Sequence, residues 1–509
     1  MEPVLLNGLH LSLEEVALVA AGRAVEITPE ARDRIARARA VVDAALERGD
    51  VAYGVTTGFG ELSSVRVDPA DAARLQVNLL RSHAAGVGPP LPREAVRAML
   101  LLRAATLARG YSGVRAVVVE RLVDLLNHDV LPVVPSQGSV GASGDLAPLA
   151  HAALVLIGEG RATYRGETLS GGEALTRAGL APLTLAAKEG LSLINGTQTS
   201  TALAALHVVA AERLAAIADL SGAMSLQALL GTDRAFDPRI HELRPHPGQL
   251  AAAANLRRLT ASSPLIASHH GCGRVQDAYS LRCMPQVHGA ARDAIAHARG
   301  VVAIEIDAVT DNPIVFPVAG DMISGGNFHG EPVAMAMDFL AIGLAELANI
   351  SERRIERLTN PQHSAGLPAF LVEHGGLNSG FMIAHVTAAA LVAENKVLCH
   401  PASVDSLPTS AGKEDHVSFS THAARKAGQV LENLSNVLAI ELLAASQGLS
   451  LRRPLVASPP CAAALAQVRE RVAYWDVDRE MASDIAAARA IIVSGALGAV
   501  AEGVADPGT

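Results

Sequence analysis

The sequence is poor in aromatic residues and in cysteine. Aromatic side chains make up 3% of its 509 residues, although 50% of the residues are hydrophobic. Apolar content that is mostly small and aliphatic suits close packing of helices better than a β-sandwich, where branched and aromatic residues dominate. The four cysteines are too scattered to form a disulfide framework: Cys272, Cys283, Cys399 and Cys461. We therefore expect reduced thiols and a core built from packed helices.

The sequence also lacks an excess of positive charge and a long apolar run. Its formal net charge of −9 gives no electrostatic case for binding nucleic acid or an anionic membrane. The first residues show no basic region followed by an apolar stretch, so we expect no secretory signal. The apolar run at 490–501 is too short to span a membrane. These features predict a cytoplasmic protein that acts on a small molecule, with neither nucleic acid nor membrane as a partner.

One short segment resembles a metal site. His269, His270 and Cys272 lie within four positions of one another. A structural metal needs a second matched group of ligands, and the sequence offers none at a suitable spacing. We expect no metal.

Helix signals dominate the chain. Ser12 with Glu15 three positions later fits a capping box. Thr28 followed by Pro29 predicts the start of a second helix, which we expect to stop at Gly49. Long segments rich in alanine and leucine predict further helices near 202–221, 285–306, 331–358 and 422–447, and strand patterns are few and short, as at 162–164. The sequence therefore predicts a mainly α protein: an N-terminal region with active-site loops at 1–110, then a long helical bundle at 111–509.

The segment GSVGASGDL, from Gly138 to Leu146, is able to turn backbone into an electrophile. No side chain is a good electron sink, but an Ala-Ser-Gly tripeptide in a tight turn can make one. The amide nitrogen of Gly144 attacks the carbonyl carbon of Ala142, and loss of water leaves Ser143 as a dehydroalanine. Glycine permits backbone angles that other residues avoid, which helps the ring to close. The pattern indicates a methylidene-imidazolone group with an exposed, polarised C=CH2.

Three other interpretations of such glycine- and serine-rich segments are a Gly/Ser loop without function, a serine-hydrolase elbow and a phosphate-binding loop. A Gly/Ser loop is the commonplace interpretation of any short motif. A serine-hydrolase elbow requires Gly-x-Ser-x-Gly, but Asp145 stands two positions after Ser143 and Gln137 stands two positions before Ser139. A phosphate-binding loop requires a third glycine, which the segment GFGELS at 58–63 lacks. Neither known motif fits.

The segment from Gly138 to Leu149 resembles the signature of the aromatic amino-acid ammonia-lyases, which use this self-made prosthetic group. The resemblance continues through YGVTTGFG at 53–60, NGTQ at 195–198, VQDAYSLRC at 275–283 and SGGNFH at 324–329. It covers nearly the whole chain in order, and several of these motifs are long and unusual in composition. The family resemblance is therefore far more specific than one loop.

The resemblance implies a role for each matched residue. Tyr279 would be the base that removes the β-proton, and the planar fork of Arg282 would bind the substrate carboxylate. If this segment is helical, Gln276 shares their face and would hydrogen-bond the prosthetic group or the substrate. Tyr53, on a glycine-rich loop, would assist proton transfer or bind the carboxylate.

Two more matched residues would shape the site. Asn195 would donate a hydrogen bond to the imidazolone oxygen and stabilise charge that develops there. Phe328 would form an apolar wall beside the methylidene. Outside this context, Asn195 would be a turn residue and Phe328 a core residue.

The segments around His83 and Glu414 resemble those of the family members that act on histidine. Both lie in segments typical of that branch, SHAAG at 82–86 and EDHV at 414–417. An imidazole substrate needs a hydrogen-bonding partner and preferably a carboxylate, whereas a phenyl ring would leave Glu414 unpaired beside an apolar group. A histidine at position 83 also occurs in tyrosine-specific relatives, so the segment Glu414-Asp415-His416 decides the expectation.

The resemblance thus implies deamination of L-histidine to trans-urocanate and ammonia. It also implies a homotetramer with active sites shared between subunits, which agrees with helices such as 331–358 that are apolar on most sides. The alternatives are a tyrosine or phenylalanine ammonia-lyase or aminomutase of the same family, and a catalytically inactive helical assembly protein. Whether the substrate amine or its ring would add to the prosthetic group stays open.

Overall fold

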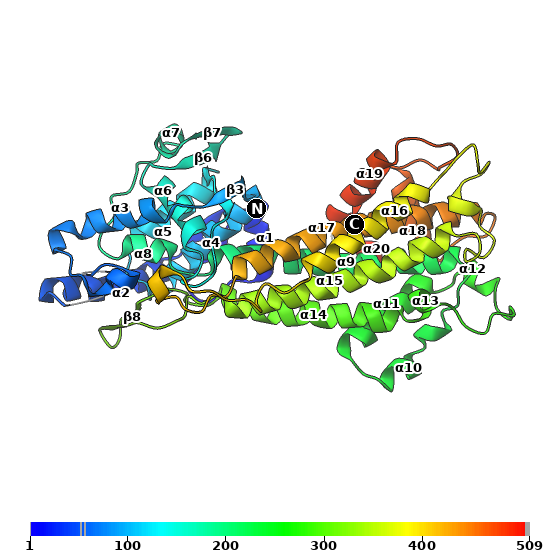
Figure 1. The fold of residues 1–509 in the computed structure, drawn as a ribbon, viewed down its shortest axis with the longest axis horizontal. Helices are drawn as coiled ribbons and strands as arrows, with labels where there is room; N and C mark the ends of the chain where they lie inside the picture. The colour runs from blue at the N-terminus through cyan, green and yellow to red at the C-terminus, as the bar shows by residue number, and fades with distance from the viewer. Residues whose placement is uncertain (1, 51–52, 55–56, 504–509) are drawn as a thin grey trace. The chain divides into compact units, whose positions relative to one another are not determined.

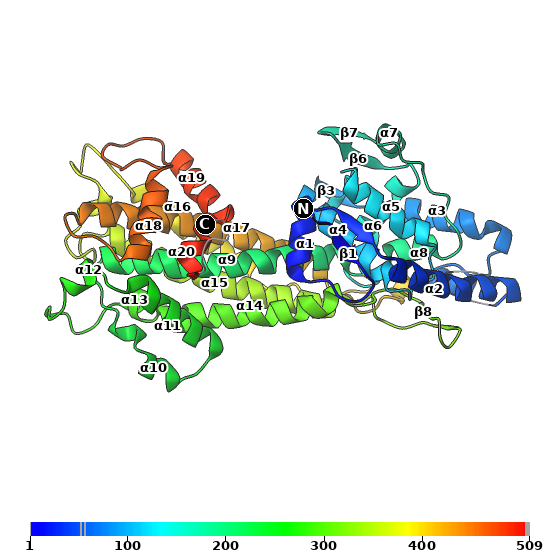
Figure 2. The same ribbon diagram turned by 180° about the vertical axis from the view of Figure 1, so that it is seen from behind.

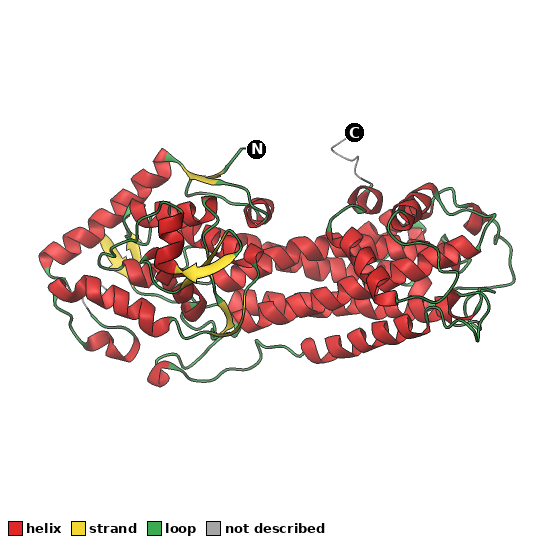
Figure 3. Ribbon diagram, turned by 90° about the horizontal axis from the view of Figure 1, so that it is seen from above, coloured by secondary structure: helices red, strands yellow, loops and turns green. Residues whose placement is uncertain are grey.

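The computed structural model describes residues 2–50, 53–54 and 57–503. Helices make up most of it and the strands are short (Figure 3), which confirms the mainly α prediction. The chain forms two compact units. The first comprises Met1–Val209, Arg299–Asp338 and Pro401–Arg425, and the second comprises Ala210–Ala298, Phe339–His400 and Lys426–Thr509.

The first unit holds the short helices of the N-terminal half. They are α1 (Leu13–Ala20), α2 (Pro29–Arg48), α3 (Ala72–His83), α4 (Arg93–Ala108), α5 (Ala116–Asn127), α6 (Leu146–Leu156), α7 (Gly171–Arg177) and α8 (Glu189–Ile194), with single 3-10 turns η1 (Gly60–Ser64), η2 (Pro69–Asp71) and η5 (Ser410–Gly412). The predicted caps are confirmed. The Ser12 hydroxyl accepts from the backbone N–H of Glu15 in a full capping box, and Thr28 caps α2. Gly49 ends α2 at a φ of 72°, in the left-handed region that glycine tolerates.

All the described strands belong to the first unit, in four small sheets. β1 (Val4–Leu6) pairs in parallel with β2 (Val25–Ile27), and β3 (Val87–Pro90) pairs antiparallel with β5 (Pro135–Gln137). β4 (Leu131–Pro132), β6 (Arg161–Tyr164) and β7 (Glu167–Ser170) form an antiparallel sheet in that order, and β8 (Ile314–Phe316) pairs antiparallel with β9 (Asp321–Ile323). Figure 2 shows β6 and β7 beside α7 at one edge of this unit.

The second unit is built from helices alone within the described residues. Four long helices contribute residues to both units: α9 (Gln198–Ala228), α14 (Met284–Ile306), α15 (Glu331–Thr359) and α17 (Ser420–Leu451). The remaining elements of the second unit are η3 (Arg234–Phe236), α10 (Pro238–Glu242), α11 (Pro247–Thr260), α12 (Pro264–Ala267), α13 (Tyr279–Arg282), η4 (Ala369–Leu371), α16 (Met382–Leu398), α18 (Pro459–Arg469), α19 (Met481–Val493) and α20 (Gly498–Glu502). The four long helices match the predicted helical segments.

Within the second unit, α9, α14, α15 and α17 run side by side (Figure 1) and a buried polar network joins them. Arg354 donates to both carboxylate oxygens of Glu441, at 2.5 and 2.9 Å. It also donates to Nε2 of His288 at 3.3 Å, so Nδ1 of His288 carries the proton that it shares with Asp219 at 2.7 Å. Burial lowers the pKa of His288 and favours this neutral ring. Because buried charges must be paired, the network sets how these helices align.

Three helices, α9, α15 and α17, are long and apolar enough to cross a membrane by length and composition. In their most apolar stretches, 67%, 67% and 83% of the residues are buried inside the protein. Contacts with the rest of the chain therefore cover most of the apolar surface that a membrane would otherwise cover.

The two units divide the chain differently from the expected boundary at residue 110. That position lies inside the first unit, between α4 and α5, which pack against each other. The first unit also takes in two segments from much later in the chain. The boundary follows packing between residues far apart in sequence, and no local composition change marks it.

Candidate active site

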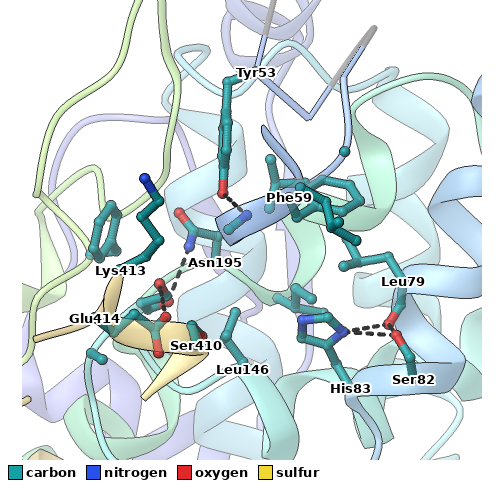
Figure 4. Close-up of a pocket in the computed structure, with 18 of the residues that line it drawn as sticks. Tyr53, Phe59, Leu79, Ser82, His83, Leu146, Asn195, Ser410, Lys413 and Glu414 are labelled. Carbon is teal, nitrogen blue, oxygen red and sulfur yellow. Dashed lines mark hydrogen bonds between the residues drawn. The ribbon is translucent and has the colours of Figure 1, made fainter. Parts of the chain in front are cut away.

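A cavity of about 950 Å³ lies in the first unit (Figure 4). Segments that are far apart in the sequence line it: the loop after α2, the end of α3, the loop before α6, the end of α8, the loop before α15 and the loop around η5. Seven of the predicted site residues are among its lining residues: Tyr53, His83, Ala142, Ser143, Asn195, Phe328 and Glu414.

The loop before α6 is held in a tight conformation that requires glycine at two positions. Gly141 and Gly144 have φ values of +69° and +74°. A methyl group on Gly144 would lie 2.3 Å from the carbonyl oxygen of Gly196, because these two backbones cross in direct contact. A methyl group on Gly141 would lie 2.3 Å from the Ser418 hydroxyl oxygen. The backbone at 141 and 144 therefore lies too close to two other segments for any residue except glycine.

Asn195 and Asp145 fix this loop from opposite sides of Ser143. The Asn195 side-chain amide donates to the carbonyl oxygen of Ser143 at 3.0 Å. Asp145 is fully buried, and its carboxylate accepts from the Ser139 hydroxyl at 2.9 Å and from the backbone N–H of Ser200 at 2.7 Å. Sequence reasoning assigned no role to Asp145. Its position next to Gly144 was the only available signal, because its partners come from distant segments.

Glu414 and His83 reach the cavity from different elements (Figure 4). Glu414 accepts from the Ser143 hydroxyl and from the Thr409 hydroxyl, each at 2.6 Å. Nδ1 of His83 lies 2.9 Å from the carbonyl oxygen of Leu79, which can only accept, so Nδ1 carries the proton and Nε2 is left as an acceptor.

The surroundings of these two groups shift both pKa values downward. Burial lowers the pKa of His83, although the Leu79 carbonyl and the charge on Glu414 oppose the shift. Burial raises the pKa of Glu414, but hydrogen bonds from Ser143, Thr409 and Ser410 outweigh burial and leave the pKa below its ordinary value. At neutral pH the cavity therefore holds a carboxylate and a neutral imidazole.

Tyr53 lies at the other side of the cavity, on the loop after α2. Its hydroxyl accepts from the backbone N–H of Gly60 at 3.1 Å, and its ring meets Phe59 edge to face at 6.2 Å. Val55 and Thr56 of the same motif lie outside the described residues. The cavity wall also includes two residues that sequence reasoning did not single out: His416 and His329, whose rings lie 5.5 Å apart.

Gly144 lies in the first unit beside the lining residues Ala142 and Ser143, and the second unit holds the remaining three predicted residues, Gln276, Tyr279 and Arg282. Tyr279 begins α13 with its side chain 70% exposed, and the guanidinium of Arg282 lies 4.6 Å from its ring centre. Gln276 stands before the helix, so the expectation of a helical face shared by all three residues was wrong. Between Gln276 and the helix, the buried carboxylate of Asp277 accepts from the backbone N–H of Thr232 at 2.7 Å.

His269, His270 and Cys272 do not form a metal site with other residues in the structure. Within the described residues, no group of three or more His, Cys, Asp and Glu side chains is placed to hold a metal ion.

The sequence profile of the aromatic amino acid lyases matches residues 11–470. This match spans the strained loop and every lining residue described above. The chain belongs to the aromatic amino acid lyase family. The resemblance drawn from the motifs is thus confirmed.

Known lyases of this family match the chain over nearly its full length. A histidine ammonia-lyase of Anaeromyxobacter sp. (strain K) is 58% identical, over 98% of this chain and 100% of that protein. The crystal structure of histidine ammonia-lyase from Trypanosoma cruzi has a TM-score of 0.92 at 46% identity, over 99% of this chain and 96% of that one. A tyrosine aminomutase from Streptomyces globisporus has a TM-score of 0.93 at 39% identity, over 98% of both chains. Because the two folds match equally well, the fold does not select the substrate.

Proposed function

We propose that this lyase converts L-histidine to trans-urocanate and ammonia. The observation that carries the proposal is the pairing of Glu414 with His83 in one cavity beside Ser143. A protonated imidazole has two N–H donors, so it can donate one to the Glu414 carboxylate and the other to Nε2 of His83, whereas a phenyl ring would leave both acceptors without partners in a partly buried site. Relatives named histidine ammonia-lyase, at 53% to 58% identity, support this choice over tyrosine or phenylalanine as substrate.

The site would also hold a methylidene-imidazolone formed from Ala142, Ser143 and Gly144. The residues fit such a group: the loop is compressed at Gly144, and the Asn195 amide already donates to the Ser143 carbonyl oxygen. The group would supply an electrophilic carbon that no side chain provides. No external cofactor and no metal are needed for this chemistry.

Replacing Gly144 with alanine is expected to prevent ring formation. Alanine would have to hold a φ near +74° with its methyl group against the Gly196 backbone, so the loop would shift and the amide nitrogen would lose its approach. Intact-protein mass spectrometry measures the outcome, because ring formation removes two water molecules. We expect the fraction of chains with this mass loss to fall at least about 100-fold, as for other misplaced reacting groups.

Gly166→Ala is the matched control for backbone strain. Gly166 has a φ of +82° in the β6–β7 turn, with no atom within 4 Å of an added methyl group. Gly166→Ala therefore places alanine in the left-handed region, at a cost of about 1–2 kcal/mol, but without a steric clash. Chains of this variant should still lose two water molecules. If every chain of the Gly144→Ala protein still lost two water molecules, the idea that close contact with Gly196 drives the ring closure would be refuted.

The remaining roles follow from the chemical problem. The β-hydrogen of an amino acid is hardly acidic, so a tyrosinate base with a pKa of about 10 needs the electrophile to activate the substrate first. Tyr279 would be that base, Arg282 would bind the carboxylate, and Gln276 would hydrogen-bond the group or the substrate. Tyr53 would assist the proton transfer, and Phe328 would wall off the ring.

We further propose a homotetramer in which different chains complete each cavity. The helix α15 exposes an apolar stripe formed by Met335, Phe339 and Ile342, whose side chains are 60%, 46% and 42% exposed. In α16, Ile383 and Val397 are 64% and 75% exposed, and only a narrow line of residues is buried. Stripes of this kind on a soluble chain are normally covered by identical subunits. Exposed Tyr279 and partly exposed Arg282 would then face the cavity of a neighbouring chain.

The cytoplasm is the compartment we propose for this enzyme. Its four cysteines form no disulfide, and its substrate and products are small and water-soluble. Incubating the purified protein separately with L-histidine, L-tyrosine and L-phenylalanine, and following the absorbance of each conjugated product, tests the proposed function. Turnover of tyrosine or phenylalanine in preference to histidine would overturn it, and no turnover of any of them would favour the inactive assembly protein.

The paired substitution Glu414→Gln with His83→Phe is expected to remove histidine turnover selectively. The two polar partners of the imidazole are lost, while the strained loop and its partner Asn195 are unchanged. We expect kcat/KM for histidine to fall at least about 100-fold, with much less weakening of cinnamate binding. The mass loss of two waters in the same preparation is the control for an intact loop. Unchanged histidine kinetics would place both residues outside the substrate pocket.

A further inference from the structure

Arg103 is a buried cation that makes its contacts through a single nitrogen. It lies on α4 with 1% of its surface exposed. One terminal nitrogen, Nη1, donates to the carbonyl oxygen of Asn195 at 2.9 Å and to Oε1 of Gln198 at 2.8 Å. The same nitrogen lies 3.3 Å from the carbonyl oxygen of Thr310. Nε and the other terminal nitrogen have no hydrogen-bond partner among the described residues.

The acceptors of Arg103 belong to the segment that supports the strained loop. Asn195 and Gly196 connect α8 to α9, and Gln198 is the first residue of α9. Gly196 accepts from the backbone N–H of Asp145 at 2.7 Å and forms the backbone bridge to Gly144. The Asn195 amide donates to Ser143. Arg103 thus contacts the same segment that contacts the loop.

A buried arginine without a direct carboxylate partner is unfavourable unless its contacts are needed. Burial lowers the pKa of Arg103 to about 10, so it remains charged at neutral pH. The acid that acts on it electrostatically, Asp311, is paired with Lys188 at 3.3 Å. The contacts that Arg103 makes are therefore to carbonyl and amide oxygens at the junction of α8 and α9, and stability alone does not explain an unpaired charge there.

We propose that Arg103 is a positioning residue that holds Asn195 and Gly196 in place for ring formation at Ala142–Gly144. By fixing the Asn195 carbonyl, it aims the Asn195 amide at Ser143 and keeps the Gly196 backbone against Gly144. The inference rests on the proposed ring and adds a residue outside the cavity to its machinery. Without Arg103 the support relaxes, and the loop is no longer compressed where the Gly144 nitrogen must reach the Ala142 carbonyl carbon.

The geometry also predicts which replacement should work. Because one nitrogen makes all three contacts and the planar fork is not used, a lysine ammonium with three donors is able to take its place. Arg103→Lys should therefore keep the function, whereas Arg103→Met, which is unbranched like lysine but has no charge and no donor, should lose it. At a bidentate arginine site the lysine variant would fail as well.

The test measures intact mass and thermal stability in wild type, Arg103→Met and Arg103→Lys, with Arg97→Met as the matched control. Arg97 lies on the same helix and is equally buried, but it donates to the carbonyls of Val19 and Leu126 and not to the loop support. We expect the fraction of chains that have lost two waters to fall at least about tenfold in Arg103→Met. It should stay near the wild-type value in Arg103→Lys and Arg97→Met, even where Arg97→Met lowers the melting temperature as much.

Each other result decides against a stated claim. A full mass loss in folded Arg103→Met, or equal impairment in Arg97→Met, would overturn the positioning role. If the wild-type protein shows no loss of two waters, the proposal that the ring forms is refuted, and this result is distinct from a failure of the Arg103 role alone. If Arg103→Met does not fold, Gln198→Leu removes one of the three acceptors and carries the test: slower ring formation supports the proposal, and wild-type ring formation overturns it.

Discussion

Ser143→Ala is expected to abolish histidine turnover while leaving the fold intact. Alanine has no hydroxyl to lose, so dehydration cannot create the C=CH2 electrophile at this position. We expect kcat to fall at least about 10³-fold, which corresponds to about 4 kcal/mol of activation free energy. The measurement is the rate of urocanate formation, with the intact mass recorded on the same protein.

The fold should survive this substitution because Ser143 contributes little packing. Its hydroxyl makes one hydrogen bond, to Glu414, which also keeps its bond from Thr409. A melting temperature close to that of wild type is the control. Near-normal turnover by the variant would remove the basis for the prosthetic group, whatever the mass shows.

Mixing two inactive variants, Tyr53→Phe and Arg282→Ala, should restore activity under subunit exchange. Tyr53 lines the cavity in the first unit, whereas Arg282 belongs to the second unit and would reach a cavity of another chain. If the two residues of each site come from different chains, about one quarter of the sites in randomly mixed tetramers contain both intact residues. We therefore expect recovery from near zero to about a quarter of wild-type activity.

Each variant carried alone through the same exchange procedure is the control, and mass measurement under native conditions confirms mixed tetramers. Failure to recover activity despite confirmed mixing would count against shared sites. A monomeric mass in solution would remove the assembly proposal altogether, and the exposed stripe on α15 would then need another explanation.

Much of the fold could be predicted because its signals are local. The capping box at Ser12 and the stop at Gly49 depend on residues within a few positions, and both are confirmed. The long helices are also confirmed, since alanine and leucine favour helix wherever they accumulate. The condition that the segment around Gln276 is helical is not met, since the helix begins at Tyr279. The neighbouring Asp277 carboxylate binds Thr232, 45 positions away, and no local preference reveals that contact.

Contacts between segments that are far apart in the chain could not be predicted from the sequence. The first unit combines three separate segments, and the expected boundary at residue 110 falls inside it. Arg103 belongs to none of the motifs, and Asp145 lies inside the GSVGASGDL segment without a role that its letters reveal; the contacts of both are to residues from distant segments. Each is a buried charge whose meaning depends on which oxygens and N–H groups surround it.

The sequence by itself determined the helical class and the family, and it led to the residues that we propose carry the chemistry. An Ala-Ser-Gly turn can form a ring only from neighbouring atoms, so its letters alone reveal its capacity. Only the tertiary structure decided that Glu414 meets the Ser143 hydroxyl, 271 positions away in the chain, and that Arg103 supports Asn195 from behind, 92 positions away. Such contacts depend on how helices pack, and packing is set by the whole core at once.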